Sequence, residues 1–138
     1  MTVDEYVAER RHLDKVIQCK LEEIAELEAL AMKVSPSSGH GDTGKVSDKV
    51  GKTVAKIVDL EAEINAHIDR LVDMKSDLIK KIDALSDPMR RVILERKYIL
   101  NNTIEVIAEK TGYSVPQINR ILPAAKKELE KMIENDMK

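Results

Sequence analysis

The feature that most constrains this fold is a series of apolar residues between positions 49 and 85, spaced alternately by three and four. Two positions of the series hold Glu61 and Lys75, and Leu60 and Met74 stand beside them. A period near 3.5 is typical of a coiled-coil-like helical seam. A helix with such a stripe buries it against another helix, so the pattern predicts a long helix with a partner. The apolar members are Val50, Val54, Ile57, Ile64, Ile68, Leu71, Leu78, Ile82 and Leu85.

Residues 3–33 supply the nearest partner, because they carry a second helical stripe. Between the two helices, residues 35–48 are dominated by Ser, Gly, Pro and Asp, which predicts a flexible linker. We therefore expect residues 1–85 to form an antiparallel helical hairpin, with pairing to another chain as the alternative. The stripe consists of Leu13, Ile17, Ile24, Leu27 and Ala31, widened by Val16 and Leu21.

One stretch of the linker imitates a phosphate-binding loop. Residues 39–45 read GHGDTGK, which matches that loop up to its lysine. The next residue should be Ser or Thr to hold magnesium, but it is Val46, and no strand precedes the stretch. We interpret residues 39–45 as part of the linker.

The region 86–138 departs from the seam pattern and predicts several short helices. The stretch Ser86-Asp87-Pro88 begins a helix over 88–100, with a capping side chain ahead of a proline in the first turn. The stretch 101–103, Asn-Asn-Thr, ends that helix and caps the next, which runs over 104–110. Gly112 ends the second helix, since glycine tolerates the left-handed conformation past a helix end.

Pro116 opens a third helix rather than breaking one. Ser114 and Gln117 have the spacing of a capping box, although Val115 is an alternative cap because residues before proline resist helical angles. Pro116 then lies in the first turn, where its missing N–H has no cost. The buried stripe of this helix is Ile118, Ile121, Leu122 and Ala125.

Together these elements fit a helix-turn-helix pattern, in which a small residue at the helix crossing precedes a turn glycine by four positions. Ala108, Gly112 and Ile118 hold the crossing, turn and corner positions. An ordinary helical hairpin is the alternative. The other apolar positions are Ile107, Tyr113 and Ile121.

Charge separates the same region from the rest of the chain. Residues 86–127 hold 8 Lys and Arg against 4 Asp and Glu, although the whole chain has a net charge of −2. A basic segment that coincides with a helix-turn-helix pattern favours nucleic-acid binding. The chain has no Phe or Trp and one cysteine, Cys19, so no disulfide framework or cysteine metal cluster is expected.

Other classes of function find little support in the sequence. No nucleophile–base pair, metal-ligand constellation or paired acid cleft is apparent, so we expect no enzyme activity, cofactor, metal or small-molecule substrate. No apolar run approaches the roughly 20 residues of a membrane span, and no signal peptide is apparent, so we expect a cytoplasmic protein without a membrane partner.

The stretches DPMRRVILERKYI, TIEVIAEKTGYS and INRILPAAKKEL, between residues 87 and 129, resemble region four of bacterial sigma factors. The whole chain resembles a family of small proteins encoded by phages and prophages of Gram-positive bacteria, some described as late-transcription regulators. The resemblance implies an all-α fold, a helical hairpin followed by a region-four-type helix-turn-helix over 86–138 that binds DNA, and RNA polymerase as a candidate partner.

This chain departs from that family in its recognition helix. Val115 and Pro116 stand where a charged residue is usual, Ile104 replaces an aromatic residue, and residues 122–126 differ from the usual His-x-Arg-Ala-Leu. Pro123 is expected to kink the helix. With three tyrosines as its only aromatic residues, the chain reads as a double-stranded DNA-binding transcriptional regulator rather than a complete initiation factor.

In a helix-turn-helix, the second helix enters the major groove by its N-terminal turns. The face opposite the buried stripe holds Gln117, Asn119 and Arg120, with Ser114 and Val115 at the tip. Arg120 suits guanine, and Gln117 or Asn119 suits adenine. The expected phosphate contacts are Lys126, Lys127, Arg90, Arg91, Arg96 and Lys97.

Two other functions are compatible with the sequence. One is a phage packaging or assembly protein resembling small terminase subunits, in which the helix pair drives oligomerisation. The other is an RNA-polymerase-binding module with little affinity for DNA. A homodimer is compatible with the regulator.

Overall fold

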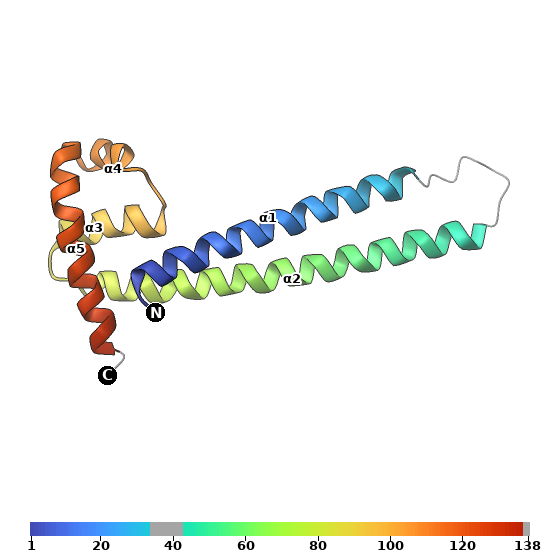
Figure 1. Ribbon diagram of the computed structural model, residues 1–138, viewed down its shortest axis with the longest axis horizontal. Coiled ribbons are helices and arrows are strands. Elements are labelled where there is room, and N and C mark those ends of the chain that lie inside the picture. The colour runs from blue at the N-terminus through green and yellow to red at the C-terminus, as the bar shows by residue number, and fades with distance from the viewer. Residues whose placement is uncertain (34–42, 137–138) are drawn as a thin grey trace. The chain divides into compact units, whose positions relative to one another are not determined.

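The computed structural model describes residues 1–33 and 43–136, and side chains throughout these ranges except over 43–47. The described residues form helices and connecting turns only, which confirms the all-α class (Figure 1). The elements are α1 (Val3–Lys33), α2 (Thr43–Asp83), α3 (Pro88–Leu94), the π-helix η2 (Glu95–Ile99), α4 (Ile104–Thr111) and α5 (Val115–Asp136).

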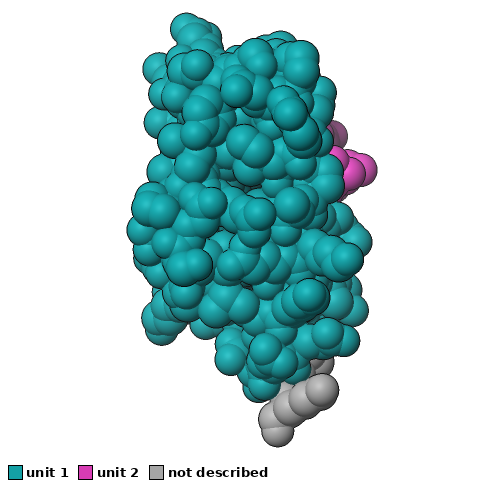
Figure 2. Space-filling model, turned by 90° about the vertical axis from the view of Figure 1, so that its left-hand side faces the viewer, with its two compact units in different colours: residues 1–10, 72–138 teal, residues 11–71 magenta. Residues whose placement is uncertain are grey.

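The chain divides into two compact units (Figure 2). Unit 1 comprises residues 1–10 and 72–138, and unit 2 comprises residues 11–71. The boundaries between these two units lie inside the two long helices. The first turns of α1 and the last turns of α2 belong with the C-terminal helices, a long-range association that local sequence patterns do not reveal.

Unit 2 is the antiparallel pairing of α1 with α2 (Figure 1). Its buried core is Ile24, Leu60 and Ile64, against which Ile17, Leu27 and Ile57 pack. At the edge of this core, Lys20 Nζ lies 2.7 Å from Glu63 Oε2. Hydrogen bonding with Glu63 raises the pKa of Lys20, and the same bond lowers the pKa of Glu63.

The side of α2 that faces α1 differs from the predicted seam. Val54 and Ile68 are 50% and 43% exposed, and Leu21 of α1 is 47% exposed, so these three assignments were wrong. The buried series instead passes through Leu60 and Met74. The series through Val54 also contains Glu61 and Lys75, and burying two unpaired charges is costly. The helix therefore presents the neighbouring series, in which the same turns carry apolar side chains.

The second difference concerns the linker. Helix α2 begins at Thr43, so residues 43–48 are helical although the sequence predicted a linker over 35–48. Extending an existing helix adds a hydrogen bond for each residue ordered, which favours continuation through a polar segment. The remainder of the predicted linker, 35–42, and most of the GHGDTGK stretch lie outside the described residues.

In unit 1, α1 contributes its first two turns to the core around α5. Val3 and Tyr6 are almost fully buried, as are Ile82 and Leu85 at the end of α2. The Val3 amide donates a hydrogen bond to Glu130 Oε1 of α5 at 3.0 Å. Residues 1–10 are therefore part of the same core as the C-terminal helices. Leu94, Leu129 and Ile133 are also buried in unit 1.

The helix predicted over 88–100 changes type halfway. Asp87 caps α3 as expected, accepting from the Met89 amide at 2.9 Å. The last turn is the π-helix η2, in which the Leu100 amide donates to the Glu95 carbonyl at 3.0 Å. Asn101 then takes a φ of 56°, a left-handed conformation that asparagine tolerates better than most residues. This geometry ends the helix and directs the chain toward α4.

Candidate nucleic-acid interface

Helix α4 has the boundaries that the sequence predicted, to within a residue. Thr103 caps its start, and its hydroxyl accepts from the Val106 amide at 3.3 Å. Gly112 ends it with a φ of 78°, and its amide donates to the Ala108 carbonyl at 3.0 Å. The glycine thus supplies the left-handed residue that a tight turn between two helices needs.

A capping box opens α5. The Ser114 amide donates to Gln117 Oε1 at 2.8 Å, and the Gln117 amide donates to Ser114 Oγ at 3.3 Å. The helix begins at Val115, so Ser114 and not Val115 is the capping residue. Pro116 lies in the first turn, and α5 continues through Pro123 to Asp136.

One apolar cluster fixes the angle between α4 and α5. Ile107, Ala108 and Ile118 are buried together with Ile93 of α3. Ala108 and Ile118 are the residues expected at the helix crossing and at the corner. The residues packed against this cluster are Met89, Ile104, Tyr113, Val115, Ile121 and Leu122.

The opposite side of the first turns of α5 is open to solvent. Asn119 and Arg120 are exposed, and neither forms a hydrogen bond or ion pair with any residue of the described ranges. Ser114 and Gln117 are also exposed, but the Gln117 amide oxygen is engaged in the capping box. Val115 is half-buried against the apolar cluster. Asn119 and Arg120 are therefore the best-presented of the five predicted base-contacting residues.

Four of the six predicted phosphate contacts have intramolecular partners. Arg90 Nη1 pairs with Glu128 Oε2, and Arg90 Nε lies 3.8 Å from Asp87 Oδ2. Arg91 donates to the Leu85 carbonyl at 3.1 Å, and Arg96 donates to Asn102 Oδ1 at 3.4 Å. These three arginines hold α3 and η2 to their neighbours.

Lys126 is the fourth predicted phosphate contact that has an intramolecular partner. This partner is Asp4, which lies in α1. The Lys126 Nζ lies 2.8 Å from Asp4 Oδ1, and this hydrogen bond raises the pKa of Lys126. Sequence reasoning did not find Asp4, because the two residues meet only through the packing of residues 1–10 on α5. Lys126 and Asp4 border a shallow groove with Lys127 and Pro123.

The remaining basic residues of this region are unengaged. Lys127 is exposed and Lys97 is half-buried, and within the described part of the chain neither has a hydrogen-bond or ion-pair partner. Lys110, at the end of α4, is equally exposed and unpaired among these residues. It was not selected from the sequence, although it lies in the basic segment 86–127. Within residues 86–127, all of which the structure describes, the cations without an intramolecular partner are thus Lys97, Lys110, Arg120 and Lys127.

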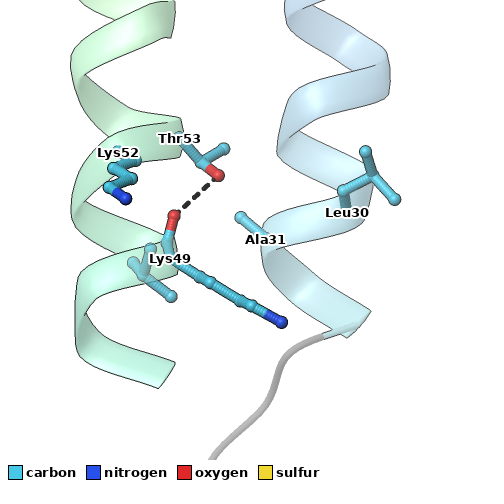
Figure 3. A pocket seen from close by; sticks show the side chains of 6 residues that line it. Leu30, Ala31, Lys49, Lys52 and Thr53 are labelled. Carbon is cyan, nitrogen blue, oxygen red and sulfur yellow. Dashed lines mark hydrogen bonds between the residues drawn. The ribbon is translucent and has the colours of Figure 1, made fainter. Parts of the chain in front are cut away.

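Unit 2 has a surface groove of a different kind, where the end of α1 faces the beginning of α2 (Figure 3). The Lys49 side chain extends toward α1, while Thr53 Oγ1 donates to the Lys49 carbonyl at 2.8 Å (Figure 3). Ala31 of α1 also lines the groove. The groove lacks the convergent polar groups typical of a small-molecule site. Leu30, Val50 and Lys52 complete its lining.

Comparison of the chain with protein-family models, with curated proteins and with solved structures finds no match. Over the described residues, the helices all lack a stretch long and apolar enough to cross a membrane.

Proposed function

We propose that this protein is a sequence-specific regulator of transcription that binds double-stranded DNA. The observation that carries the proposal is the pair of unengaged polar side chains, Asn119 and Arg120, on the open face of the second helix of a glycine-linked helix pair. The buried cluster fixes that helix against α4, so the two side chains are presented on a rigid element. A rigid presentation of this kind favours recognition of one sequence over another.

The chemistry of these two side chains matches base edges. An arginine can donate two hydrogen bonds to the N7 and O6 acceptors of guanine, and an asparagine can pair with N7 and N6 of adenine in the major groove. Gln117 is less suited to adenine, because its amide oxygen already accepts from the Ser114 amide. We therefore assign base recognition to Asn119 and Arg120, and helix capping to Gln117.

Lys97, Lys110 and Lys127 are assigned to phosphate contacts. Phosphate contacts give affinity and position the protein without selecting sequence. Arg90, Arg91 and Arg96 are assigned a structural role instead, because each already donates within unit 1. Lys126 is assigned to the contact with Asp4.

The resemblance to region four of sigma factors supports promoter DNA as the target and a phage or prophage context. RNA polymerase remains a proposed partner on the same basis.

The test is selection of duplexes from a random DNA pool by the full chain. The full chain is required because residues 1–10 and 72–85 belong to the same compact unit as the proposed recognition helix. We expect enrichment of one motif containing guanine and adenine within a few base pairs. The double variant Asn119→Ala, Arg120→Ala should lose this enrichment, and a wild-type protein that enriches no motif would contradict the proposal.

A further inference from the structure

The face of α5 that presents Asn119 and Arg120 continues through two lysines. Lys126 and Lys127 follow those residues by seven positions, which is about 10 Å along the helix. Seven residues complete nearly two turns, so the lysines lie on the same side of α5 as the proposed base contacts. Because a recognition helix enters the major groove by its first turns, residues two turns later lie toward the phosphate backbone.

The two lysines differ in what surrounds them. Lys127 is exposed and has no hydrogen-bond or ion-pair partner within the described ranges. Lys126 Nζ lies 2.8 Å from Asp4 Oδ1, and the two side chains are 34% and 79% exposed. A carboxylate oxygen and a phosphate oxygen both accept charge-assisted hydrogen bonds from an ammonium group. Asp4 therefore occupies, at Lys126, the place that a DNA phosphate would take.

The position of Asp4 is fixed by its neighbours on α1. Val3 and Tyr6 are almost fully buried in unit 1. The Val3 amide also donates a hydrogen bond to Glu130 Oε1, one turn beyond Lys126 on α5, at 3.0 Å. While residues 1–10 stay packed in this way, Asp4 can leave Lys126 only by rotating its side chain. Its negative charge then remains close to any phosphate that approaches, and like charges repel.

We propose that Asp4 withholds Lys126 from the DNA backbone and so keeps the sequence-independent part of DNA binding weak. This inference rests on the proposed function of the helix-turn-helix. Phosphate contacts supply affinity without sequence information, so withholding one cation weakens binding to every duplex alike. Asn119 and Arg120 then supply a larger share of the affinity for the selected duplex.

The test is Asp4→Asn in the full chain, titrated against the selected and the scrambled duplex at several salt concentrations. Asparagine carries no charge, so Lys126 becomes available to a phosphate. Both affinities should rise by about threefold to tenfold at low salt, and the salt slope should steepen by about one. If the wild type binds DNA and Asp4→Asn changes neither quantity, this inference is wrong and the proposed function stands. A wild type that binds neither duplex would overturn both.

A matched control removes both members of the pair. The double variant Asp4→Asn, Lys126→Ala loses the same contact between α1 and α5 but has no freed lysine. Its affinities should stay within about twofold of the wild type, with an unchanged salt slope. A gain as large as that of Asp4→Asn alone would show that lost negative charge or altered packing is the cause, and would overturn the role of Lys126.

A second control makes the same change of charge elsewhere on α5. Glu134 is exposed and has no hydrogen-bond or ion-pair partner among the described residues. Glu134→Gln should leave both affinities nearly unchanged, and a rise equal to that of Asp4→Asn would contradict a specific effect of Asp4. Thermal melts followed by circular dichroism should nearly coincide for all these variants, since exposed ion pairs contribute little to stability.

Discussion

Arg10 joins the N-terminal helix to the π-helix η2. Its Nη1 donates to the Tyr98 carbonyl at 2.6 Å and to the Ile99 carbonyl at 3.3 Å, and the Tyr6 hydroxyl donates to the same Tyr98 carbonyl. Carbonyl groups in the last turn of a helix lack partners within it. Two side chains of α1 therefore satisfy the end of η2, and this gives residues 1–10 a defined role in unit 1.

Replacing Arg10 by alanine should destabilise the protein by roughly 1.5–3 kcal/mol, the range for a hydrogen bond to a charged group. Urea unfolding of the full chain measures this loss. The matched control is Arg11→Ala, because Arg11 is exposed and contributes no hydrogen bond or ion pair within the described ranges. It should change the free energy of unfolding by less than about 0.5 kcal/mol. Equal losses for the two variants would show that Arg10 acts only through its charge.

Ile64 tests the register of the helix pair in unit 2. It is buried against Ile24 and Leu60, so Ile64→Ala should cost roughly 2–5 kcal/mol through lost burial and the cavity left behind. Leu21→Ala is the matched control, because the sequence pattern placed Leu21 on the buried stripe while the structure exposes it. Its cost should be below about 1 kcal/mol. A larger loss for Leu21→Ala than for Ile64→Ala in denaturant melts would contradict this register.

Gly112 controls the link between α4 and α5. A side chain there would meet no atom within 4 Å, so the only cost of substitution is the left-handed backbone. Gly112→Ala should therefore destabilise by about 1–2 kcal/mol. Gly112→Asn should cost less, because asparagine tolerates this conformation. Thermal melts of the two variants give the comparison, and an equal cost for both would indicate that backbone conformation is not the cause.

The elements that sequence predicted well are those with local causes. Asp87, Thr103 and Ser114 cap helices through hydrogen bonds to amides two or three residues away, so a short window of sequence contains the whole interaction. Gly112 ends α4 through its own left-handed backbone, which is also a local cause. The candidate base-contacting face followed from these boundaries, because once a helix begins at Val115 its periodicity fixes which side chains are opposite Ile118.

The features that the sequence did not predict depend on contacts between residues far apart in the chain. Helix α2 carries two overlapping heptad series, and which one faces α1 is decided by the cost of burying Glu61 and Lys75. The π-helix has no sequence pattern of its own. The partner of Lys126 is Asp4, from the other end of the chain, so its availability to phosphate was not predictable from its position on α5.

The smallest stable unit of the protein should be larger than the fragment 86–138 that the sequence suggests. Residues 86–138 lack Val3, Tyr6, Ile82 and Leu85, all nearly fully buried in unit 1. The isolated fragment 86–138 should therefore melt at a lower temperature than the full chain and with less cooperativity. A fragment that melts as sharply and as high, followed by circular dichroism, would show that residues 1–10 and 72–85 are dispensable.

We propose that α5 reads DNA sequence through Arg120, and a fluorescence-anisotropy titration of full-length variants tests this role. The titrations use the selected duplex and a scrambled duplex at two salt concentrations. Arg120→Ala should lose roughly 1–3 kcal/mol on the selected duplex and little on the scrambled one. Lys127→Ala should weaken both duplexes alike and reduce the salt slope by about one. Lys56→Ala, which removes an exposed charge from α2, should change neither affinity. If Arg120→Ala leaves both affinities unchanged, α5 is not the recognition helix.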